Sequence, residues 1–182
     1  MSNTMWHRIL IGLLVSLAAS GTVRADVEVG DAPPADVLGV DNKGADVTLS
    51  AQRGKVVVLS FWASWCTYCL KELPVLEKVQ RVLGKDRIEV IAVNIDHDRG
   101  AFLKMRRQLR DFEFTMARDE KEIAAHEFGV KALPFLVMVD KGGRVAHVHK
   151  GYSEKQLDGF VEEINSLLDA PAESATPKIA GS

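Results

Sequence analysis

The two cysteines of this chain lie three positions apart, in the segment Trp65-Cys66-Thr67-Tyr68-Cys69, and the sequence contains no others. A nearly continuous apolar run over residues 56–62 precedes them, and apolar residues at helical spacing over residues 70–83 follow them. The run predicts a strand buried on both faces of a sheet, and the spacing predicts an amphipathic helix. Two thiols at such a strand-to-helix junction are typical of sites that exchange thiols and electron pairs.

The place of each cysteine at this junction predicts a different chemistry for each. If Cys66 caps the helix, its sulfur faces the free amides of the first turn and the positive end of the helix dipole. Both stabilise the thiolate, which is the nucleophilic form of cysteine. Cys69 lies one turn further in and closer to the core, so we expect it to resolve a mixed disulfide formed at Cys66.

Two other interpretations of the cysteine pair are weaker. A structural disulfide across so short a loop would remove little entropy from the unfolded chain, so it would stabilise the fold poorly. A structural zinc site needs four protein ligands, and no histidine lies near the two cysteines in the sequence. We therefore expect no metal and no separate cofactor, because the Cys66–Cys69 dithiol is itself the redox group.

Strand-like and helix-like segments alternate along the rest of the chain. Apolar runs predict strands over residues 37–40, 47–49, 56–62, 88–95, 135–139 and 145–148. Apolar stripes at helical spacing predict helices over residues 70–83, 102–112, 123–128 and 157–168, the last of them capped by Ser153. This order predicts an α/β fold with one mixed sheet that is covered by helices on both faces.

The two ends of the chain differ from this central domain, which we place at residues 26–169. Residues 1–25 contain an apolar run over residues 9–19 and then Val23-Arg24-Ala25, a pattern typical of a secretory signal peptide. The apolar run is short for a membrane span, and an uncleaved anchor is the alternative. Either arrangement would place the domain in an oxidising compartment. Residues 170–182 are small and polar with two prolines, which predicts a disordered tail.

The charge balance argues against one class of partner. The formal net charge is −2, and it becomes more negative when Arg8 and Arg24 of the leader are left out. Proteins that bind nucleic acids usually carry a basic patch or stripe. We therefore expect no nucleic-acid partner.

The cysteine segment and its flanks resemble a known family. Phe61-Trp62-Ala63-Ser64-Trp65-Cys66-x-x-Cys69 is similar to the active-site signature of the thioredoxin superfamily, and Leu70-Lys71-Glu72-Leu73-Pro74 narrows the resemblance to the TlpA/ResA-like branch. The resemblance covers about residues 30–168. It implies a thioredoxin fold with an N-terminal β extension and a central helix–strand insertion over about residues 96–119.

The same resemblance implies a function and a location. Members of this branch are extracytoplasmic thiol–disulfide oxidoreductases, some of which serve cytochrome c maturation. The resemblance therefore implies protein thiols or disulfides as substrates, a membrane electron donor or acceptor, and a periplasmic location. The direction of electron flow is left open by the sequence.

The resemblance also assigns roles to single residues. Cys66 matches the attacking cysteine and Cys69 the resolving one. Pro134 matches the cis-proline that faces the dithiol, and the backbone of Leu133 would then lie beside Cys66 and pair with the substrate chain. An ordinary trans-proline at the entry to a strand is the alternative, because cis X-Pro bonds are uncommon.

Glu72 is the expected proton-exchanging group. It is three positions after Cys69, so the two residues share a helical face. Burial would raise the pKa of its carboxyl and suit it to proton exchange with Cys69, the role that the resemblance also implies. The alternative is a solvated carboxylate paired with Lys71 or Lys78. Ser60 stands where cytoplasmic thioredoxins have a buried aspartate, which favours Glu72 as the base.

Three residues around the cysteines are expected to tune reactivity or bind the client. Trp65 is expected to be exposed as an apolar docking surface, with incidental exposure as the alternative. Thr67 and Tyr68 are expected to tune the redox potential. Many relatives carry proline where Tyr68 stands, and our hypothesis is that the Tyr68 amide donates a hydrogen bond toward the Cys66 sulfur.

Two other function classes remain open at this point. One is a copper-handling thioredoxin-like module, although the known examples use Cys-x-x-x-Cys and a later histidine. The other is a thioredoxin-like interaction protein without catalysis. His147 and His149 share one strand face and are interpreted as solvent-facing rather than metal-binding, since two ligands rarely make a site. The segment Asp96-His97-Asp98 is interpreted as a polar loop.

Overall fold

The computed structural model describes residues 26–171, so the predicted leader and most of the predicted tail lie outside the described residues. Seven strands form one mixed sheet in the order β2-β1-β5-β4-β3-β6-β7. The strands are β1 (Val37–Val40), β2 (Asp46–Thr48), β3 (Val56–Trp62), β4 (Ile88–Asn94), β5 (Thr115–Arg118), β6 (Phe135–Val139) and β7 (Val145–Lys150). The predicted α/β fold with a mixed sheet is confirmed.

Strands β3, β4 and β5 are parallel, and they form the centre of the sheet together with the antiparallel β6. The two central strands β3 and β4 are buried along their whole length, as their continuous apolar runs predict. The hairpin of β1 and β2 joins the sheet through β5, and it forms the predicted N-terminal β extension. The predicted central insertion corresponds to helix α2 (Arg99–Gln108) and strand β5.

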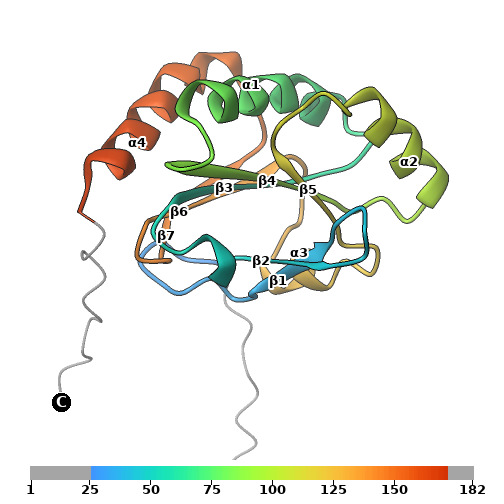
Figure 1. Ribbon diagram of the computed structural model, residues 1–182, viewed down its shortest axis with the longest axis horizontal. Coiled ribbons are helices and arrows are strands. Elements are labelled where there is room, and N and C mark those ends of the chain that lie inside the picture. Colours follow the sequence, from blue (N-terminus) through green and yellow to red (C-terminus); the bar gives the residue numbers. More distant parts are fainter. Residues whose placement is uncertain (1–25, 172–182) are drawn as a thin grey trace, which may run out of the picture.

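Helices cover both faces of the sheet, as Figure 1 shows. Helices α1 (Thr67–Leu83), α2 and α4 (Leu157–Asp169) lie over one face, and the short α3 (Ile123–Glu127) lies on the other. The alternating side chains of β3 supply both cores, because Val57, Leu59 and Phe61 face one side and Val56, Val58 and Trp62 face the other. The sheet therefore separates two apolar layers, and both cysteines belong to the layer under α1 and α4.

Two details of the helices matter for the site. Pro74 lies inside α1, which nevertheless continues to Leu83 and ends at Gly84 with a φ of 75°. The predicted cap of the last helix is wrong: Ser153 starts a 3₁₀ turn over Glu154–Gln156, and neither that turn nor α4 has a side-chain cap.

Within residues 26–171, no helix is both long enough and apolar enough to cross a membrane.

Candidate active site

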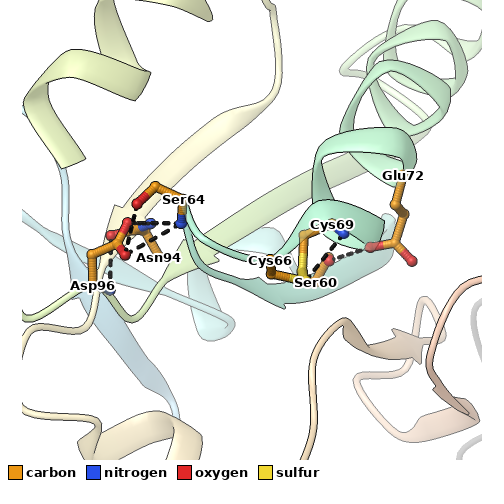
Figure 2. The surroundings of a disulfide bond; sticks show 7 residues. All are labelled: Ser60, Ser64, Cys66, Cys69, Glu72, Asn94 and Asp96. Atoms are coloured by element: carbon orange, nitrogen blue, oxygen red, sulfur yellow. Dashed lines mark hydrogen bonds between the residues drawn. A yellow bond between two sulfur atoms is a disulfide. The ribbon is translucent and has the colours of Figure 1, made fainter. Parts of the chain in front are cut away.

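The two cysteines form a disulfide at the junction between β3 and α1 (Figure 2). Cys66 is the N-cap of α1, and its sulfur accepts a hydrogen bond of 3.2 Å from the backbone amide of Cys69. Cys69 is fully buried, whereas Cys66 keeps 6% of its surface exposed. The outer sulfur therefore sits at the positive end of the helix dipole, where a thiolate is stabilised once the bond is reduced.

The hydrogen-bond donor to the Cys66 sulfur differs from our hypothesis. We expected the Tyr68 amide, but the donor is the amide of Cys69, one residue further along. An N-cap side chain can accept from either of these positions, and only the local geometry selects between them. The Tyr68 side chain is exposed, and the Lys71 ammonium lies 6.0 Å from the centre of its ring.

Glu72 lies one turn after Cys69 and is buried, with 5% of its surface exposed. Burial raises the pKa of its carboxyl to about 7, and a hydrogen bond from Ser60 opposes this rise. That bond runs from Ser60 Oγ to Glu72 Oε2 over 2.6 Å (Figure 2). The burial and the raised pKa agree with the sequence prediction, whereas a solvated glutamate paired with a lysine does not. The role of Ser60 as a hydrogen-bond donor was missed.

Leu133 and Pro134 occupy the turn before β6. Their peptide bond is cis, as the resemblance implies. Pro134 is buried, and its carbonyl accepts a hydrogen bond of 2.8 Å from the Gly151 amide. Leu133 is half-buried and packs against the apolar cluster that contains both cysteines. The turn thus lies against the same core layer as the disulfide.

The surface next to the cysteines is apolar. Trp65 is 71% exposed, and Tyr68 and Leu70 are also among the exposed large apolar side chains. Thr67 is exposed as well, at the first position of α1. Trp62, by contrast, is completely buried. The exposure predicted for Trp65 is present, and a large apolar side chain beside a reactive sulfur provides contact area for a client chain.

A buried carboxylate that the sequence interpretation missed supports the segment before Cys66. Asp96 lies in the loop after β4, as the interpretation of this segment as a polar loop predicts, but it is only 3% exposed. Its carboxylate accepts hydrogen bonds from the backbone amide and the hydroxyl of Ser64, each at 3.0 Å. It also accepts one of 2.8 Å from the side-chain amide of Asn94 (Figure 2). These bonds join the end of β4 to the residue two positions before Cys66. An aspartate directly after a buried strand was the signal for this contact.

The two histidines of β7 face α4 and are only partly exposed, so the expectation of a solvent-facing pair holds only in part. Both rings contact Glu163 of α4: His149 Nε2 lies 2.7 Å from Glu163 Oε2, and His147 Nδ1 lies 3.6 Å from Oε1. All three side chains are about one-third exposed or less. In the described part of the chain, no group of three or more histidine, cysteine, aspartate or glutamate side chains is placed to hold a metal.

A thioredoxin-like sheet with a Cys-x-x-Cys disulfide at the start of α1 defines the class of thiol–disulfide oxidoreductases. Comparison with known proteins agrees: the sequence profile described as Redoxin matches residues 28–168. The chain belongs to the redoxin family.

Its relatives carry the same activity in their names. The chain is similar to the thiol–disulfide oxidoreductase ResA of Geobacillus kaustophilus, with 32% identity over 84% of this chain and 91% of the relative. It is also similar to ResA of Bacillus cereus, with 29% identity over 89% of this chain and 97% of the relative. Among solved structures, the putative thiol:disulfide interchange protein DsbE from Chlorobium tepidum has a TM-score of 0.72 and 31% identity, covering 79% of this chain and 99% of that one.

Proposed function

We propose that this oxidoreductase works outside the cytoplasm as a reductant of protein disulfides, with cytochrome c precursors as its clients. The observation that carries the chemistry is the arrangement along α1: Cys66 caps the helix, Cys69 is buried behind it, and Glu72 follows with a pKa of about 7. The resemblance to the TlpA/ResA-like branch supports the client, the periplasmic location and a membrane partner that supplies electrons. The signal-like segment over residues 1–25 also supports that location.

The reaction follows from the positions of the three groups. In the reduced protein, the Cys66 thiolate attacks one sulfur of the client disulfide, which forms a mixed disulfide and releases one client thiolate. Cys69 then transfers its proton to Glu72 and attacks the Cys66 sulfur. This step releases the second client thiolate and forms the Cys66–Cys69 disulfide, which is the state of this structure. Two electrons pass to the client, and the two client thiolates take up protons from solvent.

Client binding is proposed to use the surface next to Cys66. Trp65 supplies exposed apolar area, and the backbone of Leu133 pairs with the client chain, as the family resemblance implies. Thr67 and Tyr68 are proposed to adjust the reduction potential from the first turn of α1. For Tyr68 the proposed means is its place in that turn, since the amide that reaches the Cys66 sulfur belongs to Cys69.

A trapping experiment tests this function. In Cys69→Ser the resolving thiol is missing, so the mixed disulfide at Cys66 should accumulate and can be purified from cells under non-reducing conditions. We expect a client that carries a Cys-x-x-Cys-His haem-attachment segment. The matched control is the double variant Cys66→Ser with Cys69→Ser, which should trap nothing. Equal recovery from both variants, or a wild-type protein that cannot reduce insulin disulfides, would contradict the proposal.

A further inference from the structure

A small cavity that is partly open to solvent is lined by the buried residue Glu72. It has a volume of about 40 Å³, and its wall includes Glu72 of α1, His149 of β7, Tyr152 and Ser153 of the following loop, and Phe160 of α4. A cavity needs roughly 10–15 Å³ to hold a water molecule, and that water needs polar partners. Glu72, His149, Tyr152 and Ser153 carry polar groups that can serve as such partners. The cavity therefore has room for water between Glu72 and His149.

The imidazole of His149, another lining residue of this cavity, is held by contacts with α4. Its Nε2 lies 2.7 Å from Glu163 Oε2, and its ring contacts the edge of Phe160 at a centroid distance of 6.3 Å. The side chains of His149 and Glu163 are 27% and 28% exposed, so both reach solvent. With a proton on Nε2, His149 donates to Glu163, which leaves Nδ1 to accept another proton.

Glu72 needs a route of this kind if it exchanges a proton in each reaction cycle. Its carboxyl is buried, and the hydrogen bond that it accepts comes from the Ser60 hydroxyl, which cannot carry the proton away to solvent by itself. The titratable groups around His149 are Glu72 across the cavity, Glu163 on α4, His147 on β7 and Tyr152 in the loop. Burial, together with Glu154 and Glu72, raises the pKa of Tyr152, so that hydroxyl stays neutral.

We propose that His149 is a proton-relay residue that passes the proton of Glu72 to solvent. This inference rests on the proposed role of Glu72. After Cys69 has given its proton to Glu72, a cavity water takes that proton from the carboxyl and gives one to His149 Nδ1. His149 then releases its Nε2 proton toward Glu163 and bulk water, and exchange with water moves the remaining ring proton from Nδ1 back to Nε2 before the next cycle. Histidine suits this step, because each of its two ring nitrogens can carry a proton.

The test is a single-turnover measurement in dilute, non-imidazole buffer. Reduced protein is mixed with a small-molecule disulfide, formation of the Cys66–Cys69 disulfide is registered by tryptophan fluorescence, and the release of the Glu72 proton to solvent that follows it is measured with a pH-indicator dye as a function of pH. We expect His149→Gln to be slower by about tenfold near neutral pH, which is less than the 10²–10⁴-fold effect of a full general acid–base group. Free imidazole in the buffer should restore the rate. His147→Gln is the matched control, because His147 also contacts Glu163 but does not line the cavity, and it should react as the wild type does.

Glu163→Gln is a second variant, which keeps the imidazole but weakens its orientation. It should show a smaller loss than His149→Gln, and thermal unfolding of all variants checks that they fold. The relay is wrong if His149→Gln reacts at the wild-type rate, or if it is slow and imidazole does not restore it. Glu72→Gln separates the two proposals. If Glu72→Gln is slow while His149→Gln is normal, only the relay fails, but if Glu72→Gln also reacts normally, the proposed role of Glu72 fails.

Discussion

Ser60 of β3 donates a hydrogen bond of 2.6 Å to the Glu72 carboxylate of α1, and both side chains are buried. Two opposite influences meet at this carboxylate. Burial favours the neutral acid, while the hydroxyl donor favours the charged form. Their balance leaves a pKa of about 7, at which a carboxyl group can both accept and release a proton near neutral pH.

The Ser60→Ala variant should raise the pKa of Glu72 above its value of about 7. The change removes the donor that stabilises the carboxylate and leaves the burial in place. A hydrogen bond to a charged group contributes about 1.5–3 kcal/mol, which corresponds to a rise of about one to two pKa units. Carbon NMR titration of the labelled carboxyl group measures this, and Ser166→Ala on the exposed side of α4 is the control. A pKa that stays constant or falls would contradict the prediction.

The Glu72→Gln variant should change how stability depends on pH. The folded-state pKa of about 7 is above the ordinary value of 4.5, so the folded protein binds the proton more tightly than the unfolded chain does. The free energy of unfolding should therefore fall as pH rises from about 4.5 to about 7 and then level off. The shift corresponds to a loss of roughly 3 kcal/mol, since one pKa unit is about 1.4 kcal/mol.

Glutamine does not titrate, so Glu72→Gln should lack this fall. Urea unfolding of the oxidised proteins at pH 5 and pH 8 measures the difference. Glu162→Gln serves as the control, because Glu162 is an exposed residue of the same protein and its removal should leave the fall intact. If the free energy of unfolding falls equally between pH 5 and pH 8 in Glu72→Gln and in the wild type, Glu72 is not the group responsible.

The Asp96→Ala variant should destabilise the segment that carries Cys66. It leaves the backbone amide of Ser64, the hydroxyl of Ser64 and the side-chain amide of Asn94 without their acceptor. Each buried unsatisfied group costs about 1–3 kcal/mol, so we expect a loss of at least about 2 kcal/mol in the free energy of unfolding. Asp98→Ala is a matched control: Asp98 is exposed and caps α2 through the Gly100 amide, which is typically worth about 1 kcal/mol. Equal losses in both variants would contradict the role of Asp96.

The Trp65→Ala variant should lower the rate of reaction with protein disulfides and leave the reaction with dithiothreitol unchanged. Trp65 offers exposed apolar area to a client chain, whereas a small dithiol needs only the Cys66 sulfur. A central aromatic contact is often worth 2 kcal/mol or more, which predicts a drop in kcat/KM of about 30-fold or greater. Val82→Ala is the control, since Val82 is equally exposed but lies at the other end of α1. Parallel losses with both substrates would indicate an effect on the disulfide itself.

Much of the fold could be predicted from patterns within short stretches of the chain. The buried strands β3 and β4 follow from continuous apolar runs, and α1 follows from apolar spacing that ends at a glycine. The capping position of Cys66 follows from the strand-to-helix junction. The cap of α4 could not be predicted, because a 3₁₀ turn comes between Ser153 and the helix, and helix boundaries depend on backbone details that composition does not show.

The contacts that surround the active site were not predictable in the same way. Ser60 and Glu72 are 12 residues apart, and Ser64 and Asp96 are 32 apart, so each contact exists only because two elements meet in one register. The contact of His149 with Glu163 likewise needs β7 and α4 to pack together. Side chains that look polar and exposed in the sequence become buried partners when such elements meet.

The sequence by itself determined where the dithiol lies and what class of chemistry it serves, since a buried strand, two cysteines and a helical stripe follow one another without interruption. The tertiary structure decided how that chemistry is supported: which amide reaches the Cys66 sulfur, which hydroxyl reaches Glu72, and which carboxylate holds the segment before the cysteines. The physical reason is that helix and strand formation depend mainly on local spacing, whereas burial and hydrogen bonding depend on partners that only the folded chain brings together.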